Sequence, residues 1–137
     1  MIIIDAGPIV AIFDKDDNYH GVCVEILKKI KEPLITTWPV ITEAFYLLNF
    51  SLQVQDDLWE FIQRGGIKIE PLDKNIYSRC RELMKKYHNL PADITDISLV
   101  AIAEEMNIST IFTLDHKDFS FYRTKHKKSF ILLPSRL

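Results

Sequence analysis

The chain has 137 residues, of which 47% are hydrophobic and 26% charged, values typical of one globular domain with its own core. The formal net charge of −2 gives no global signal for nucleic-acid binding and leaves room for a local basic patch. No apolar stretch approaches the roughly 18 residues of a membrane span, and no basic segment precedes the apolar residues 1–4, so we expect neither a membrane helix nor a signal peptide. Cys23 and Cys80 lie outside any zinc-binding spacing, and we expect two buried thiols in a cytoplasmic protein.

Short apolar strands alternate with amphipathic helices from one end of the chain to the other. The strands are predicted at residues 1–4, 34–37, 67–70, 109–113 and 130–133. The helices are predicted at about 8–14, 19–30, 39–49, 54–64, 76–87 and 93–106. The last helix is apolar nearly all round at residues 99–103, so we expect it to be buried. The alternation predicts an α/β fold with a mainly parallel sheet, in a single domain over residues 1–137.

Four acidic residues are predicted to lie at one edge of this sheet. Asp5 follows the first strand, Glu43 lies about one turn into the helix after the second strand, Asp96 lies in the first turn of the buried helix, and Asp115 follows the fourth strand. The C-terminal ends of parallel strands and the N-terminal ends of the following helices share one edge, where ligands usually bind. Carboxylates that meet there repel each other unless a cation neutralises them. The placement therefore predicts a metal site.

Each acid also has a local structural explanation. Asp93 and Asp96 have the spacing of a helix cap, Asp115 suits a turn, and Glu43 alone reads as a solvated helix charge. Asp5 is the hardest to explain in this way, because a carboxylate that ends a buried apolar strand is costly unless it is paired or bound to a cation. The joint placement, more than any single acid, favours the metal site.

Four segments of the sequence, taken in order, resemble the PIN-domain family. They are residues 4–11 (IDAGPIVA), the Thr42-Glu43 pair, residues 92–101 (ADITDISLVA) and residues 112–119 (FTLDHKDF). The resemblance is to the small ribonucleases that include VapC-type toxins, and it covers nearly the whole chain. It implies a three-layer α/β/α sandwich around a parallel sheet.

The resemblance also assigns the acids. The catalytic quartet of the family corresponds to Asp5, Glu43, Asp96 and Asp115. Asp93, one helical turn before Asp96, is then either an auxiliary metal ligand or a helix cap.

The chain departs from the family immediately after the first acid. Many VapC-like toxins carry a hydroxyl residue there, whereas this chain has Ala6 and Gly7. Thr113 is the candidate to supply that hydroxyl, because it is predicted at the same edge of the sheet. Its alternative role is that of an ordinary β-branched strand residue.

The implied chemistry is metal-dependent hydrolysis of RNA. Oxygen ligands without Cys or His favour Mg²⁺ or Mn²⁺. We expect Asp5, Asp96 and Asp115 to bind the cation directly and Glu43 to act directly or through water, with two cations suiting in-line attack on a phosphodiester. The resemblance implies an endoribonuclease that cleaves single-stranded RNA, as the toxin of a VapBC-type pair. Its expected protein partners are a cognate antitoxin that reaches the acidic groove and a second copy in a homodimer.

Two surfaces are candidates for these partners. Residues 116–128 combine cations with aromatic side chains, as an RNA-binding segment would. The cations are Lys117, Arg123, Lys125, Lys127 and Lys128, and the aromatics are Phe119, Phe121 and Tyr122. Trp38, Phe45, Tyr46 and Trp59 are candidates for an antitoxin contact or a homodimer interface. In both sets, the alternative is that the aromatic side chains belong to the core. Asp17 and His20 are expected to organise a loop and a helix start.

Other interpretations need features that this chain lacks. A phospho-acceptor receiver domain needs an acidic pair near its start, and Asp5 has no acidic neighbour. A haloacid-dehalogenase-type phosphatase needs a second Asp two residues after the first, and that position is Gly7. The remaining alternative is a catalytically silent PIN domain that binds RNA or protein, which retention of all four acids disfavours.

Overall fold

The computed structural model describes residues 1–90, 92–126 and 128–136. These residues form a five-stranded sheet of order β3-β2-β1-β4-β5, in which every neighbouring pair of strands is parallel. In chain order the elements are β1 (Ile2–Ile4), α1 (Ala6–Phe13), α2 (His20–Lys29), β2 (Leu34–Thr36), α3 (Trp38–Leu47), α4 (Leu52–Gln63), β3 (Lys68–Ile69), α5 (Lys74–Lys86), α6 (Ile94–Met106), β4 (Thr110–Phe112), α7 (His116–Phe121) and β5 (Ile131–Leu133). The predicted α/β fold with a parallel sheet is confirmed.

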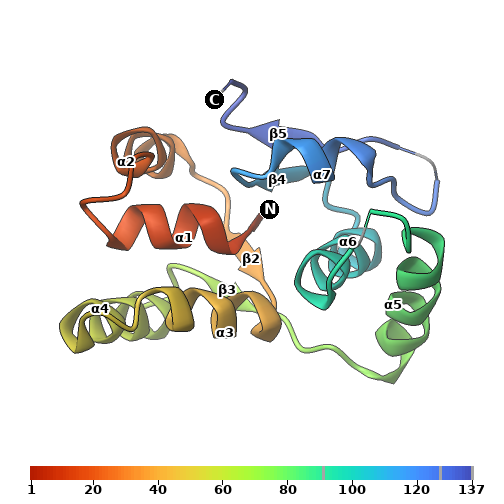
Figure 1. Ribbon diagram of the computed structural model, residues 1–137, viewed down its shortest axis with the longest axis horizontal. Helices are drawn as coiled ribbons and strands as arrows, with labels where there is room; N and C mark the ends of the chain where they lie inside the picture. The colour runs from red at the N-terminus through yellow and green to blue at the C-terminus, as the bar shows by residue number, and fades with distance from the viewer. Residues whose placement is uncertain (91, 127, 137) are drawn as a thin grey trace.

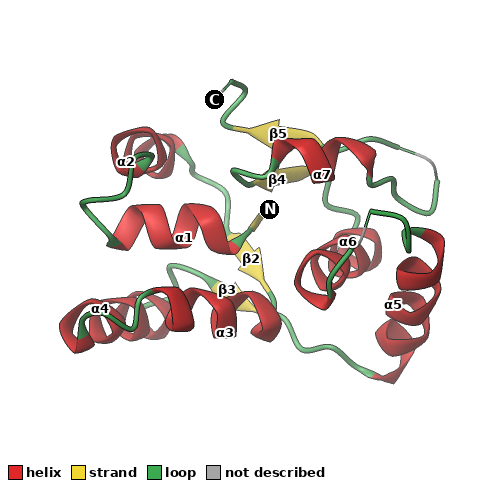
Figure 2. Ribbon diagram, viewed as in Figure 1, coloured by secondary structure: helices red, strands yellow, loops and turns green. Residues whose placement is uncertain are grey.

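Helices cover both faces of the sheet (Figures 1 and 2). Helices α1 to α4 lie on one side, where α1 packs against α2, α3 and α4, and the pair α5–α6 lies on the other. Helices α3 and α6 also contact each other. This arrangement is the predicted three-layer sandwich, and it brings the helices that carry Glu43 and Asp96 together.

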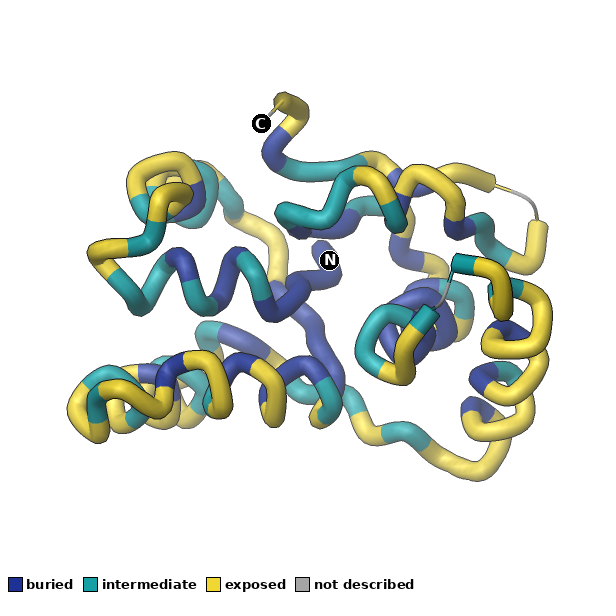
Figure 3. Tube along the Cα trace, viewed as in Figure 1, coloured by how far each residue is buried: buried dark blue, intermediate teal, exposed yellow. Residues whose placement is uncertain are grey.

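The core is centred on β1 and α6 (Figure 3). All three residues of β1 are buried, and so is every residue of α6 from Ile97 to Ala103. A strand covered on both faces and a helix surrounded by protein explain why neither segment shows an amphipathic pattern. The predicted burial of α6 is confirmed.

Side-chain caps set where several helices begin. Asp5, Ser51, Asp73, Asp93 and Asp115 each accept a hydrogen bond from a backbone N–H at the start of the helix that follows. Such caps satisfy amide groups that have no partner within the helix. Helix α6 ends at Met106, because the next residue, Asn107, has a left-handed φ of 55° that stops the helix.

The main difference from the predicted elements is α7, which the sequence pattern did not indicate. This helix has six residues and buries only Phe119, so it has no repeating apolar face to recognise. Helix α1 also begins earlier than expected, at Ala6, because Pro8 is accommodated within the first turn. Among the described residues, no helix combines the length and apolarity needed to cross a membrane.

Candidate metal centre

The chain creates a crevice where β1 and β4 lie side by side. From β1 the chain passes to β2 on one flank, and a later crossover places β4 on the other flank. In parallel sheets, ligands usually bind at the C-terminal edge of such a switch point. Asp5 follows β1 and donates its backbone N–H to the carbonyl of Phe112, the last residue of β4, at 2.9 Å. The end of β1 is thereby joined to the strand that leads to Asp115.

An open pocket of about 490 Å³ occupies this edge. Its walls are Asp5, Ala6, Gly7, Glu43, Leu47, Asp93, Asp96, Leu114, Asp115 and Asp118. The structure therefore brings all four predicted acids together, with Asp93 beside them. Their roles as metal ligands and catalytic groups stay predictions. Across residues 1–90, 92–126 and 128–136, no Lys, Arg or His forms an ion pair with an acid of this pocket.

Asp5 is the most buried of these acids, with 7% of its surface exposed. Its Oδ1 accepts a hydrogen bond from Ala6 N at 2.8 Å, and its Oδ2 accepts one from Thr113 Oγ1 at 2.9 Å. Burial raises the pKa of Asp5 to about 6, and the charges of Glu43 and Asp115 add to the shift against the opposing effect of the two hydrogen bonds. Both oxygens of the carboxylate are held in place, but its charge has no cationic partner among the residues that the structure describes.

Thr113 connects two of the acids. Its buried hydroxyl donates to Asp5 Oδ2 and accepts a hydrogen bond from the backbone N–H of Asp115 at 3.0 Å. The side chain is thus a polar connector at the end of β4, and not only a β-branched residue that fills space. Whether it replaces the hydroxyl missing at Ala6-Gly7 in substrate or metal binding stays a prediction.

Asp96 lies in the first turn of α6, and it lines the pocket. Its Oδ2 accepts a hydrogen bond from Tyr122 Oη at 3.1 Å. Burial raises the pKa of Asp96 to about 8, and the negative charges of Asp5, Asp93 and Asp115 contribute to the shift. Asp93 caps α6 through Oδ1, which accepts from Asp96 N at 3.0 Å. The capping role of Asp93 is therefore real, and its role as a ligand stays a prediction.

Asp118 is a member of the pocket that the sequence analysis did not single out. Asp96, Asp115 and Asp118 each offer a carboxylate oxygen, and these atoms lie within 4.8 Å of one another. The pKa of Asp118 is raised mainly by burial and to a smaller extent by the negative charge of Asp115. The available signal was the spacing of Asp115 and Asp118, which is that of a cap and the third residue of a helix. It was missed because α7 was not predicted.

The sequence of residues 2–127 matches the family model of the PIN domain. The chain belongs to the PIN-domain family. No curated protein matches the sequence.

Solved structures with the same fold include bacterial toxins. VapC20 of Mycobacterium tuberculosis, a sarcin-ricin loop cleaving toxin, shares 15% identity over 81% of this chain and 87% of its own, with a TM-score of 0.71. VapBC2 of Rickettsia felis, bound to a DNA fragment from its promoter, shares 21% identity over 96% of this chain and 97% of its own, with a TM-score of 0.66. FitAcB of Neisseria gonorrhoeae shares 20% over 100% of both chains, with a TM-score of 0.67. At these identities the likeness shows a common fold.

The acids of this PIN domain fit a hard divalent cation. The polar side chains that line the pocket are all carboxylates, without Cys or His. Oxygen donors of this kind suit Mg²⁺ or Mn²⁺. The raised pKa values of Asp5 and Asp96 reflect burial together with mutual repulsion, and a cation among the carboxylates would remove that repulsion.

Glu43 is the outermost of the four predicted acids. It is exposed on α3, and its pKa is raised by partial burial and then by the charge of Asp93. Its position suits a contact through water as well as a direct one. Asp17 and His20 do not line the pocket: Asp17 Oδ1 accepts from Tyr19 N, and His20 Nδ1 lies 2.7 Å from the carbonyl oxygen of Ala11. They organise the loop before α2, as expected.

The aromatic part of the predicted RNA-binding segment needs a correction. Phe119 and Tyr122 are fully buried, and their rings pack edge-on with 5.2 Å between the centroids. Because neither ring is exposed, they cannot stack on bases. Phe121 is exposed, as are Lys117, Lys125 and Lys128, whereas Arg123 is half-buried. Lys127 lies outside the described residues.

The aromatic residues of α3 and α4 lie mostly on the surface. Trp38, Tyr46 and Trp59 are 51%, 71% and 45% exposed. Phe45 is half-buried, and its ring packs against the Trp59 ring with 4.6 Å between the centroids. The core alternative is therefore wrong for the first three. Large exposed aromatic groups are typical of surfaces that other molecules cover.

Proposed function

We propose that this PIN domain is an Mg²⁺- or Mn²⁺-dependent endoribonuclease, the toxin of a VapBC-type toxin–antitoxin pair. The observation that supports it most is the meeting of Asp5, Glu43, Asp96 and Asp115 in one pocket without a cationic side chain. Such a cluster is costly for a folded protein unless a divalent cation occupies it.

In the proposed reaction, the carboxylates hold the cation and the surrounding groups hold the carboxylates. Asp5, Asp96 and Asp115 bind it directly, and Glu43 binds it directly or through water. The bound cation supplies stabilisation of the charge that develops on the phosphodiester and lowers the pKa of the attacking water. Ala6 N and Thr113 Oγ1 fix the carboxylate of Asp5, which keeps the ligand geometry constant during the reaction.

RNA is proposed as the substrate because the family resemblance implies it, and VapC20, a protein of the same fold, is named as a sarcin-ricin loop cleaving toxin. The acids alone would repel a phosphodiester backbone, so its binding requires the cation and nearby basic residues. Exposed Lys117 and Phe121, both on α7 next to Asp115, are the groups most suitably placed for phosphate contact and base stacking.

The proposed protein partners are a cognate antitoxin and a second copy of the chain. The VapBC2 structure carries the name of a toxin–antitoxin pair, which supports the antitoxin by analogy of fold. Trp38, Tyr46 and Trp59 offer an exposed aromatic surface for one of these contacts.

The proposal is tested by cleavage of single-stranded RNA by the full-length protein. Cleavage should require Mg²⁺ or Mn²⁺ and stop on chelation, and Asp5→Asn should reduce it at least about a hundredfold, because a direct ligand is lost. Asp73→Asn is the matched control: Asp73 caps α5 outside the pocket, and Asn preserves the cap. Undiminished cleavage by Asp5→Asn overturns the assignment, and absence of any cleavage leaves the binding-module alternative.

A further inference from the structure

Tyr122 is a buried residue at the end of α7 whose hydroxyl contacts Asp96, one of the acids that line the pocket. Its side chain is fully buried, and its Oη donates to Asp96 Oδ2 at 3.1 Å. Among the described residues, this is the only hydrogen bond that the carboxylate of Asp96 receives from protein. The phenol therefore engages Oδ2 and leaves Oδ1 of Asp96 without a protein donor.

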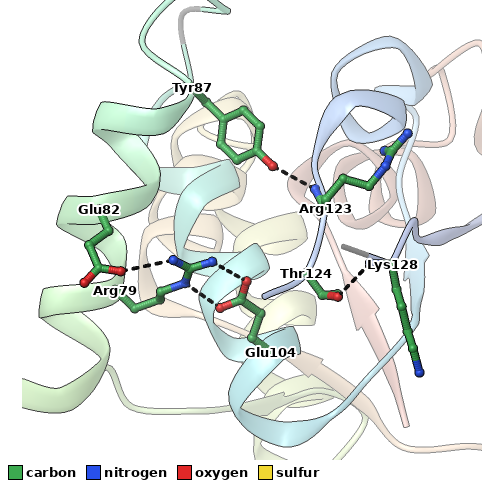
Figure 4. A network of polar contacts seen from close by, with 7 residues as sticks. All are labelled: Arg79, Glu82, Tyr87, Glu104, Arg123, Thr124 and Lys128. Atoms are coloured by element: carbon green, nitrogen blue, oxygen red, sulfur yellow. Dashed lines mark hydrogen bonds and ion pairs between the residues drawn. The ribbon is translucent and has the colours of Figure 1, made fainter. Parts of the chain in front are cut away.

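Two other aromatic rings hold the phenol in position. The Tyr122 ring packs edge-on against the Tyr87 ring, with 5.0 Å between the ring centroids and 86° between the ring planes. It packs in the same way against the Phe119 ring, at 5.2 Å and 73°. The hydroxyl of Tyr87 accepts a hydrogen bond from the backbone N–H of Arg123 at 2.9 Å, as Figure 4 shows. The backbone directly after Tyr122 is thereby tied to the end of α5. The two ring contacts, which a phenylalanine at position 87 would keep, restrict the orientation of the Tyr122 ring.

We propose that Tyr122 is a positioning residue of the metal site, whose hydroxyl orients the carboxylate of Asp96 toward the cation. The inference rests on the proposed function, because it requires that the pocket bind a divalent cation. A carboxylate that binds a metal ion is commonly hydrogen-bonded by a neighbouring group, and loss of that group lowers metal affinity about 10- to 100-fold.

The chemistry of a phenol suits this task. Tyrosine, with an ordinary pKa of about 10, is an uncharged donor at neutral pH. It therefore orients Asp96 without neutralising the negative charge that attracts the cation. A lysine or arginine in the same place would also fix the carboxylate, but its charge would compete with the metal ion.

A role in packing alone is the alternative, and two matched substitutions separate it from positioning. Tyr122→Phe removes the bond to Asp96 and keeps the ring. Tyr87→Phe removes the equivalent hydroxyl from a neighbouring ring. The hydrogen bond that it loses is the one donated by Arg123 N, which involves no acid of the pocket. If Tyr122 only packs, the two variants should behave alike.

The test is Mn²⁺ binding to the full-length protein and both variants, measured by calorimetric titration, together with RNA cleavage as a function of Mn²⁺ concentration. We expect Tyr122→Phe to bind Mn²⁺ about tenfold more weakly and Tyr87→Phe to stay within about twofold of wild type. Half-maximal cleavage by Tyr122→Phe should need about ten times more Mn²⁺, with the rate largely restored at saturation.

Three results would overturn the inference. Equal affinity of Tyr122→Phe and wild type would remove the positioning role while leaving the proposed nuclease intact. Equal weakening by both variants would reduce Tyr122 to packing. A wild-type protein that neither binds Mn²⁺ nor cleaves RNA would overturn the proposed function as well.

Discussion

Two parts of this protein contain buried or half-buried carboxylates, and they differ in how the negative charge is balanced. At the α5–α6 contact, Arg79 meets Glu104 through two hydrogen bonds, from Nε to Oε2 at 2.7 Å and from Nη2 to Oε1 at 2.9 Å, and also reaches Glu82 (Figure 4). In the pocket, Asp5 at the end of β1 and Asp96 in the first turn of α6 are held by neutral donors, Thr113 and Tyr122, and by the backbone amide of Ala6.

The difference separates a structural acid from acids that are available to a ligand. A planar guanidinium opposite Glu104 compensates its charge and joins two helices. Thr113 and Tyr122 fix the direction of the pocket carboxylates but leave their charge unbalanced. The pKa values follow the same division: that of Arg79 is raised by its bonds to Glu104, whereas those of Asp5 and Asp96 are raised by burial and by like charges.

The largest expected effect on stability comes from breaking the structural pair. Arg79→Met leaves Glu104, whose side chain is only 9% exposed, without its cation. We expect the free energy of unfolding to fall by about 2 to 3 kcal/mol, less than for a fully buried pair because Arg79 is itself 24% exposed. Urea denaturation measures the change. Glu82→Gln is the control and should cost less than about 0.5 kcal/mol, because Glu82 is 67% exposed. A loss of Mn²⁺ affinity in Arg79→Met would contradict the claim that the Arg79–Glu104 pair is structural and independent of the pocket.

The next effect is a pH dependence that arises from the pocket. Asp5 and Asp96 have pKa values of about 6 and about 8 in the folded protein, above the ordinary pKa of about 3.9 for an aspartate side chain. Between these limits the folded state binds more protons than the unfolded state, so the metal-free protein should lose stability as pH rises from about 4 to 8. We expect the free energy of unfolding to fall steadily across this range, as measured by urea denaturation. Saturating Mn²⁺ should flatten the profile, and an equally steep profile with the ion bound would contradict the proposed origin of the effect.

A smaller effect is expected from the hydroxyl that joins Asp5 and Asp115. Thr113→Val keeps the shape of the side chain and removes its two hydrogen bonds. We expect a loss of about 1 kcal/mol in the free energy of unfolding, together with weaker Mn²⁺ binding, because Asp5 Oδ2 loses its donor. Thr113→Ser retains the hydroxyl and should restore metal binding. If Thr113→Val and wild type bind Mn²⁺ equally, the hydroxyl has no part in ordering the site.

The sequence predicted the parts of the site that depend on topology. Asp5 could be recognised because it interrupts a buried apolar strand, and Asp115 because it follows another. In a parallel sheet these strand ends share one edge, so the meeting of residues far apart in the chain followed from the alternation of strands and helices. The motif order distinguished Asp96 from its neighbour Asp93, which the structure shows to cap α6.

The parts that were missed depend on tertiary contacts. Asp118 enters the pocket through α7, a helix too short to produce a periodic pattern. Tyr122 was grouped with the aromatics of the predicted RNA-binding segment, because its contacts with Tyr87 at the end of α5 and Asp96 on α6 join segments distant in sequence. No local pattern carries that information.

The most direct test of the central claim is the stability of wild type and Asp96→Asn, each measured by urea denaturation near pH 8 with and without Mn²⁺. Without the ion, the variant should be more stable than wild type by about 1 kcal/mol, because a buried and repelled charge has been removed. With Mn²⁺ at about a hundred times its Kd, wild type should gain about 2.7 kcal/mol and the variant much less, so that the order reverses. A variant less stable than wild type without the ion, combined with equal gains from Mn²⁺, would show that Asp96 is a structural acid and not a ligand. No gain from Mn²⁺ in wild type would contradict the metal site itself.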